Sequence, residues 1–85
     1  MMNIELGNPT KRFLAKCHPE LYERLMERMQ LLAVNPFPQD VKRVGGRKEK
    51  IFRVRMGDYR IQYVVLYAEN VLLISDVDKR SRAYD

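Results

Sequence analysis

Cysteine and histidine are almost missing from this chain. A single cysteine, Cys17, cannot close a disulfide within the chain. The single histidine, His18, leaves too few ligands for a zinc site built from cysteine and histidine. Apolar runs are also short, since none approaches the ~20 residues that a membrane-spanning helix needs, and the N-terminus lacks the apolar stretch of a signal peptide. These absences favour a cytoplasmic protein that uses no metal, cofactor or membrane.

The length and the charge distribution narrow the choice further. With 85 residues, 46% of them hydrophobic, the chain can form one small domain, residues 1–85, around one core. Residues 1–40 carry five basic and five acidic residues, whereas residues 41–85 carry eleven and six, so the whole net charge of +5 lies in the second part. Such an uneven charge favours a nucleic acid or an acidic protein as partner. The alternative is a surface that only keeps the protein soluble.

Two helices are expected in the first forty residues. Asn8 and Pro9 suit an N-cap and a first helical position. A second helix should run from Pro19 to about Val34, with His18 as a residue of the helix boundary rather than a chemical group. Its apolar stripe consists of Leu21, Leu25, Met29 and Leu32, widened by Tyr22, Met26 and Ala33.

The second half of the chain alternates as strands do. Residues 51–56 and 59–67 have apolar side chains at every second position, and Gly57-Asp58 between them suits a tight hairpin turn. Val71–Val77 is apolar enough for a central strand, Asn3–Leu6 could add a weak first strand, and residues 41–50 read as a flexible loop. The predicted fold is therefore α+β, with an N-terminal helical hairpin packed on one face of a small antiparallel sheet.

Arginines recur on these strands. Arg53 and Arg55 should face away from the core, and the hairpin should bring Arg60 close to Arg55. If the end of the third strand also lies beside the hairpin, at least four guanidinium groups surround one concave site. Arginine binds phosphate oxygens in a two-pronged fork, which makes such a site suitable for a polyanion. The alternative is that the arginines are spread over a wet sheet face and keep an edge soluble.

Tyr84 stands outside the strand pattern, in a basic tail. Cations nearby would lower its pKa below the ordinary ~10 and make it a candidate base. The alternative is that its ring packs on the sheet without any chemical role.

The segments IFRVRMGDYRIQYVV and VLLISDVDKRSRAYD, after a helical hairpin that ends in Asn-Pro, resemble the RelE/ParE toxin superfamily of prokaryotic toxin–antitoxin systems. The resemblance covers nearly the whole chain and is closer to the compact archaeal members of the RelE branch than to ParE. It implies a toxin that enters the ribosomal A site and cuts messenger RNA by attack of a ribose 2′-OH on the adjacent phosphate, without a metal.

The resemblance also implies roles for single residues. Arg60 corresponds to the arginine that stabilises charge on the scissile phosphate, Arg80 to the one at the leaving oxygen, and Tyr84 to the tyrosine that stacks on or activates the attacking nucleotide. Lys79 stands where many relatives have a histidine that acts as a base, so a mechanism based on histidine is not available. The residues expected to bind RNA are Arg47, Lys48, Lys50, Arg53, Arg55 and Arg82.

The implied partners are the ribosome with its mRNA and a small, acidic, helical antitoxin, with a heterotetramer as one candidate assembly. Two other functions stay open on the sequence. One is a ParE-like toxin that inhibits a topoisomerase (gyrase) and catalyses nothing. The other is a plain RNA-binding module, or a degenerate toxin without activity.

Overall fold

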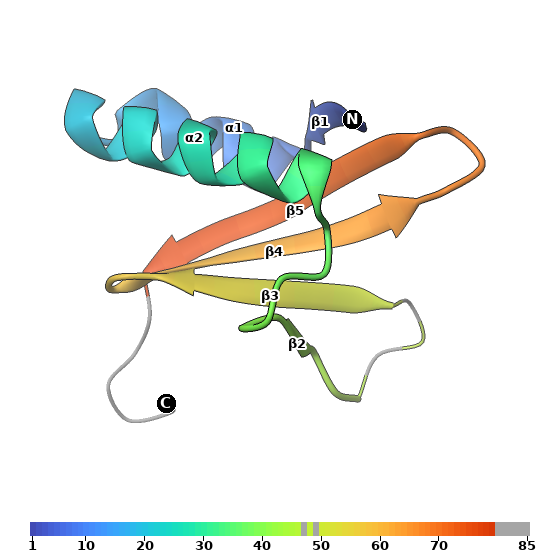
Figure 1. The fold of residues 1–85 in the computed structure, drawn as a ribbon. Helices are drawn as coiled ribbons and strands as arrows, with labels where there is room; N and C mark the ends of the chain where they lie inside the picture. The colour runs from blue at the N-terminus through green and yellow to red at the C-terminus, as the bar shows by residue number, and fades with distance from the viewer. Residues whose placement is uncertain (47, 49, 80–85) are drawn as a thin grey trace.

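The computed structural model describes residues 1–46, 48 and 50–79, which form two helices on one face of a five-stranded sheet (Figure 1). The elements are β1 (Asn3–Leu6), α1 (Asn8–Lys16), α2 (Pro19–Val34), β2 (Lys42–Arg43), β3 (Ile51–Met56), β4 (Tyr59–Leu66) and β5 (Val71–Lys79). The strand order is β1-β5-β4-β3-β2. All neighbouring strands are antiparallel except β1 and β5, which are parallel.

This architecture confirms the predicted α+β class and the central place of the third long strand. The weak first strand is confirmed with its predicted bounds, but it pairs in parallel with β5. In addition, two residues of the expected loop form β2, β4 ends at Leu66 instead of Tyr67, and β5 continues to Lys79 instead of ending at Val77. The extra length of β5 matters for the site, because it carries the strand alongside the start of β4.

The first turn of helix α1 is hydrogen-bonded to β5. The N-cap is Gly7 and not Asn8, which is already helical. The Gly7 backbone N–H donates to the Ile74 carbonyl (2.8 Å), and the Thr10 hydroxyl donates to the same oxygen (2.9 Å). A Cβ at Gly7 would lie only 3.1 Å from that oxygen, so any other residue would force the β5 backbone to shift by a few tenths of an ångström, which favours glycine here. The sequence prediction placed the cap at Asn8 because this backbone contact leaves no mark in the local sequence.

Helix α2 begins and ends where the sequence predicted. His18 is its N-cap, and the Nδ1 atom of His18 accepts a hydrogen bond from the Glu20 backbone N–H (3.2 Å), which confirms a boundary role. The helix buries Leu25, Met29, Leu32 and Ala33 against the sheet. Tyr22, expected to widen the apolar stripe, is 43% exposed because it lies at the edge of that stripe in the first turns of the helix.

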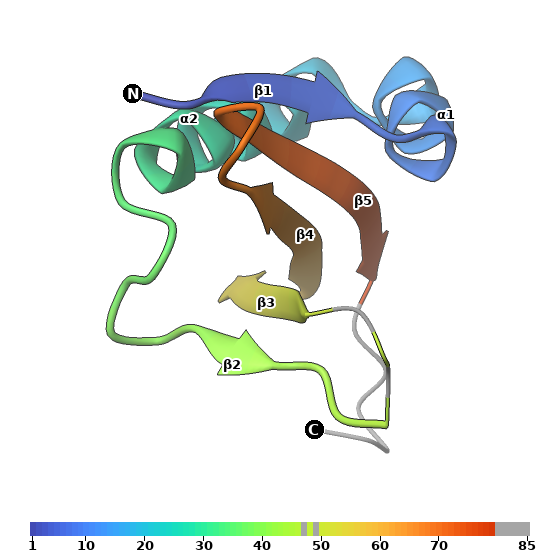
Figure 2. The same cartoon turned by 90° about the vertical axis from the view of Figure 1, so that its right-hand side faces the viewer.

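The helices lie over the β1–β5 side of the sheet, and the chain after α2 runs past the sheet toward β2 (Figure 2). This connecting segment packs aromatic rings on the β3 side. The ring of Phe37 contacts Phe52 edge to face, with 5.1 Å between centroids, and Phe52 lies 6.1 Å from the ring of Tyr63. The core therefore continues past the helices, with Val54, Ile61 and Tyr63 buried on the helix-side face of the sheet.

A β-bulge interrupts the pairing of β4 with β5. Gln62 pairs with Asp76 and Tyr63 with Ile74, so Ser75 is an extra residue in β5. Because side chains alternate between faces, the extra residue exchanges the two faces beyond it. As a result both Ile74 and Val77 are buried in the core, and Asp76 and Asp78 face the other way.

Candidate nucleic-acid interface

The face of the sheet away from α1 and α2, here called the far face, carries two rows of charged and polar residues. Residues directly opposite each other in an antiparallel pair share a face, so the pairing defines each row. The first row is Arg55, Arg60 and Asp78, and the second row is Lys42, Arg53, Gln62 and Asp76. The cations of the two rows lie on β2, β3 and β4, and the carboxylates lie on β5. The orientation of Arg53 and Arg55 away from the core, predicted from the alternation, is confirmed, since Val54 between them is 1% exposed.

Arg60 is held in place by a neighbour on β5. Its Nε atom donates to Oδ1 of Asp78 (3.1 Å) and its Nη2 atom donates to Oδ2 (3.2 Å). The Arg60 side chain is 19% exposed and that of Asp78 is 36% exposed, so the ion pair is partly withdrawn from water. Arg55 on β3 lies directly opposite Arg60 in the β3–β4 pair. Two like charges at opposite positions repel each other, and the Asp78 carboxylate offsets that repulsion.

Two conditions that the sequence analysis set for an arginine cluster are confirmed, but one residue at this place, Asp78, was not predicted. The hairpin brings Arg60 beside Arg55, and the end of β5 lies beside the hairpin, where Lys79 pairs with Tyr59. Asp78 was not singled out from the sequence. Strict alternation places it on the same face as Ile74, and only the bulge at Ser75 brings it to Arg60.

A cleft of about 220 Å³ opens at the β2–β3 edge and is lined by Asp40, Lys42, Arg53 and Arg55. Its three cations provide the positive potential that a phosphate group needs. Arg60 does not line this cleft but lies on the adjacent strand, next to Arg55. The cationic cleft and Arg60 are thus neighbours in space, although Arg60 is not part of the cleft lining.

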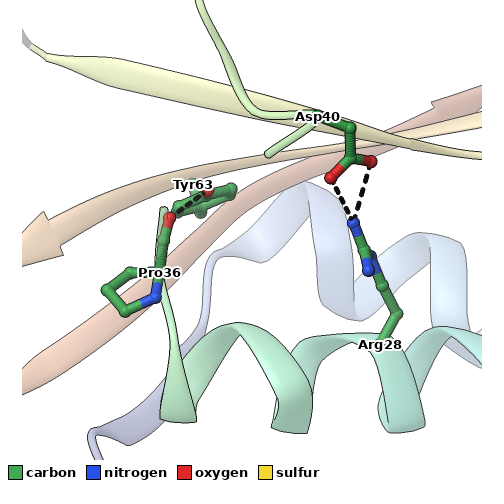
Figure 3. Close-up of polar contacts among 4 residues, drawn as sticks. All are labelled: Arg28, Pro36, Asp40 and Tyr63. Carbon is green, nitrogen blue, oxygen red and sulfur yellow. Dashed lines mark hydrogen bonds and ion pairs between the residues drawn. The ribbon is translucent and has the colours of Figure 1, made fainter. Parts of the chain in front are cut away.

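Asp40, the acidic residue that lines the cleft, is held by an arginine of α2. The Nη2 atom of Arg28 on α2 lies 3.1 and 3.0 Å from the two carboxylate oxygens of Asp40 (Figure 3). The same connecting segment is held at Pro36, whose carbonyl accepts a hydrogen bond from the Tyr63 hydroxyl. Burial raises the pKa of Tyr63 from 10.0 to about 12, an effect that Arg28 opposes and Asp40 reinforces. The phenol therefore stays protonated and keeps donating at every physiological pH.

Two further predicted RNA ligands lie at the opposite end of β3 from Arg55. Lys48 and Lys50 precede that strand and are exposed. At ~3.3 Å per strand residue, Lys50 lies roughly 17 Å from Arg55 along the strand. The other predicted site residues, Arg47, Arg80, Arg82 and Tyr84, lie outside the described residues.

The described residues contain no group of three or more histidine, cysteine or acidic side chains placed to hold a metal ion. Among the described helices, neither is long and apolar enough to cross a membrane.

Comparisons with known proteins agree on one family. Residues 6–84 match the family model described as the ParE toxin of the type II toxin–antitoxin system parDE. A protein of Methanocaldococcus jannaschii with the provisional name toxin RelE1 is 33% identical over 96% of this chain and 93% of its own.

Solved structures extend the likeness to three dimensions. The chain matches a structure of the archaeal RelE–RelB complex from Pyrococcus horikoshii with a TM-score of 0.79 and 26% identity, over 95% of this chain and 97% of that one. It matches the E. coli RelBE toxin–antitoxin complex with a TM-score of 0.81 and 17% identity, over 96% and 100% of the two chains, a level of identity at which the match speaks for the fold alone. With its fold, its arginine-bearing strands and these matches, the chain belongs to the RelE/ParE superfamily of type II toxin–antitoxin toxins.

Proposed function

We propose that this protein is a ribosome-dependent mRNA endoribonuclease, which stops translation by cutting mRNA in the ribosomal A site in the cytoplasm. The observation that supports this most is the placement of Arg60. Its guanidinium lies on the far face and is held by two hydrogen bonds to Asp78. Arg60 also lies beside Arg55 and next to the cationic cleft that Lys42 and Arg53 line. A phosphodiester backbone that follows the cleft would pass Arg60 within the reach of its side chain.

In the proposed reaction, the 2′-oxygen of one ribose attacks the adjacent phosphorus. The new P–O2′ bond forms as the P–O5′ bond breaks, the 2′-hydroxyl loses its proton to a base, and the leaving 5′-oxygen gains a proton. Arg60 stabilises the charge that builds up on the non-bridging oxygens, Arg80 acts at the leaving oxygen, and Tyr84 stacks on or activates the attacking nucleotide. Reactions of this kind depend mainly on positioning and charge stabilisation, which arginines provide without a metal.

The proposed dependence of cleavage on the ribosome has a chemical reason, because arginine and Lys79 are poor groups for proton transfer. Arginine stays protonated at physiological pH and is a poor proton donor or acceptor, and Lys79 occupies the position where many relatives have a histidine. Holding the 2′-oxygen in line with the phosphorus can contribute ~7–11 kcal/mol to a reaction of this type. A ribosome that orients the RNA would supply much of what the side chains do not.

We further propose that a small, acidic, helical antitoxin holds the protein inactive, with a heterotetramer as one candidate assembly. The P. horikoshii and E. coli relatives were crystallised as complexes with RelB. The cationic rows of the far face offer an acidic segment the electrostatic complementarity that speeds and directs association. Binding there would cover the arginines or make the toxin too bulky for the A site.

A ParE-like inhibitor of a topoisomerase is the second candidate, and it is favoured by the family model, which is named for ParE toxin. Pulse labelling after induced expression separates the two. The nuclease predicts that amino-acid incorporation falls first, whereas a topoisomerase inhibitor predicts an earlier loss of thymidine incorporation. Mapping of mRNA ends on purified ribosomes that carry this protein then tests the nuclease directly, and intact mRNA at full ribosome occupancy would reject it.

A further inference from the structure

The far face holds a carboxylate to which the proposed chemistry gives no role. Asp78 accepts hydrogen bonds from Nε and Nη2 of Arg60. We propose that Asp78 is a positioning residue, which sets the orientation of the Arg60 guanidinium toward the RNA phosphate. This inference rests on the proposed nuclease function and deepens it, because it names a residue through which Arg60 acts.

The geometry of the ion pair carries the proposal. Both carboxylate oxygens meet the same edge of the guanidinium, at 3.1 and 3.2 Å. Since the guanidinium is planar and rigid, two bonds to one edge fix both its plane and the direction of its opposite edge. An arginine without such a partner moves among many rotamers, and misplacement by ~1 Å in an active site can cost ~100-fold in rate.

A β-bulge in β5 places the Asp78 carboxylate on the far face. If Ser75 were paired as an ordinary strand residue, side-chain alternation would turn Asp78 to the core face together with Ile74. With the bulge, Asp78 pairs directly with Arg60 across the strands. Bulges often re-aim a side chain beside a functional site, and here the re-aimed side chain is the one that holds Arg60.

The charges on either side of Arg60 also favour its contact with Asp78. The Arg60 side chain is 19% exposed, and Arg55 lies directly opposite it with the same charge. Repulsion from Arg55 on β3 and attraction by Asp78 on β5 act on the Arg60 guanidinium in the same direction, because the two residues lie on opposite sides of β4. Both therefore favour the contact with Asp78 that fixes the guanidinium.

If Asp78 positions Arg60, and if Asp78 only competes with RNA for Arg60, its removal should change the cleavage rate in opposite directions. A carboxylate that only competed with RNA for Arg60 would slow cleavage, so that removing it would speed cleavage. A carboxylate that positions Arg60 is needed for cleavage although its negative charge weakens RNA binding. Its removal should therefore make RNA binding equal or tighter and cleavage slower, a combination that general loss of structure does not produce.

The test compares Asp78→Asn with a matched control, Asp76→Asn. Both substitutions remove one negative charge from the same face of β5, but Asp76 lies opposite Gln62 and not Arg60. Cleavage is measured as the single-turnover rate on mRNA-programmed ribosomes at saturating protein. Binding is measured by fluorescence anisotropy with a single-stranded 2′-O-methyl RNA oligonucleotide, which lacks the attacking hydroxyl.

We expect Asp78→Asn to lower the cleavage rate about tenfold or more while the oligonucleotide binds as well as before or better. Asp76→Asn should match its binding and keep the parent cleavage rate, and Asp78→Glu, which retains the charge, should recover part of the loss. A cleavage rate in Asp78→Asn at or above that of the parent overturns the proposal, as does an equal loss in Asp76→Asn.

A parent protein that cleaves nothing on ribosomes would instead defeat the proposed function. The positioning role is then decided by hydrogen exchange of the Arg60 Nε–H, followed by NMR. Faster exchange in Asp78→Asn but not in Asp76→Asn supports the role, and unchanged exchange in both overturns it.

Discussion

The hydroxyl of Tyr63, in the middle of β4, donates a hydrogen bond to the backbone carbonyl of Pro36, 27 residues earlier in the chain (Figure 3). This bond ties the segment after α2 to the sheet. Phe37 then packs on Phe52, and four residues after Pro36 the chain reaches Asp40 at the cleft. A contact on the helix side of the sheet thus helps to fix a wall of the cationic cleft.

Substitution of Tyr63 by phenylalanine should weaken the fold. The ring stays, but the Pro36 carbonyl loses its partner, so we expect the free energy of unfolding to fall by about 1–2 kcal/mol. Urea denaturation followed by circular dichroism measures the change. Tyr67→Phe is the control, because Tyr67 is 72% exposed and should have no effect. Equal denaturation midpoints for the parent and Tyr63→Phe would contradict the prediction.

The raised pKa of Tyr63 predicts a loss of stability in alkali. Burial holds the pKa of the folded phenol at about 12, above its ordinary value of 10.0, so the folded state favours the protonated form. This contribution is complete below pH 10 and is lost as the pH rises through about 12. The stability advantage of the parent over Tyr63→Phe should therefore shrink across this range. All other groups are common to the two proteins, so their contributions cancel in the difference.

The sequence predicted the elements whose patterns are local. The stripe of α2, the alternation of β3 and β4, and the Gly57 turn, where φ is +61°, need only neighbours along the chain to be recognised. For the same reason the alternation was enough to place Arg53 and Arg55 on the face away from the core. The closeness of Arg60 to Arg55 followed from the length of the hairpin turn.

The parts that the sequence did not predict depend on distant pairing. The parallel pairing of β1 with β5 joins segments at opposite ends of the chain, and Arg28 meets Asp40 only because of how the connecting segment turns. The bulge at Ser75 has no glycine or proline to mark it. Without the bulge, the partner of Arg60 could not be deduced, since the period of two places Asp78 on the wrong face.

Deletion of Ser75 should leave the two faces of β5 unchanged. Once the extra residue is gone, Asp76 follows Ile74 directly, so strict alternation keeps Ile74 and Val77 in the core and Asp76 and Asp78 on the far face. Ser75→Ala keeps the extra residue and loses only the hydroxyl bond to the Gln62 carbonyl (3.2 Å), at a cost of about 1 kcal/mol. The deletion loses the same bond, so we expect both variants to fold with similar melting temperatures, which thermal unfolding measures. Failure of the deletion variant to fold would contradict the assignment of Ser75 as the extra residue.

Arg53→Ala and Arg55→Ala should weaken RNA binding more than the cleavage step. Each loss of a phosphate contact should reduce the slope of log affinity against log salt by ~0.7 for a single strand. Arg24→Ala removes the same charge from the helix side of the molecule and should leave the slope unchanged. Loss of Lys48 or Lys50 should matter only for oligonucleotides long enough to reach the other end of β3. Equal slopes for Arg24→Ala and Arg53→Ala would refute a phosphate track on the far face.

Two proposed catalytic residues outside the described part of the chain can be tested by substitution. Arg80→Ala should abolish toxicity without unfolding the domain. Tyr84→Phe keeps the ring and removes the hydroxyl, so it separates stacking from proton transfer. If Tyr84 only stacks, Tyr84→Phe should cleave ribosome-bound mRNA nearly as fast as the parent while Tyr84→Ala does not. Equal loss in both variants would assign the role to the hydroxyl.

Arg60 should matter most for the chemistry. A donor aimed at developing charge stabilises the transition state more than the ground state, and removing one such donor costs ~10²–10³ in rate. Arg60→Ala should lower single-turnover cleavage by this amount while circular dichroism stays unchanged. Arg60→Lys keeps the charge but cannot bond both oxygens of Asp78 with one rigid edge, so it should remain closer to the alanine variant than to the parent.

The double variant Arg60→Ala/Asp78→Asn then shows whether the two residues act as a unit. If Asp78 works by orienting Arg60, it has nothing to orient once the guanidinium is gone, and the double variant should cleave no more slowly than Arg60→Ala alone. Independent roles would instead make the two losses multiply, because mutational effects add as free energies only at uncoupled sites. Cleavage by Arg60→Ala at the parent rate on ribosomes would remove this arginine from the reaction, and the role assigned to Asp78 in cleavage with it.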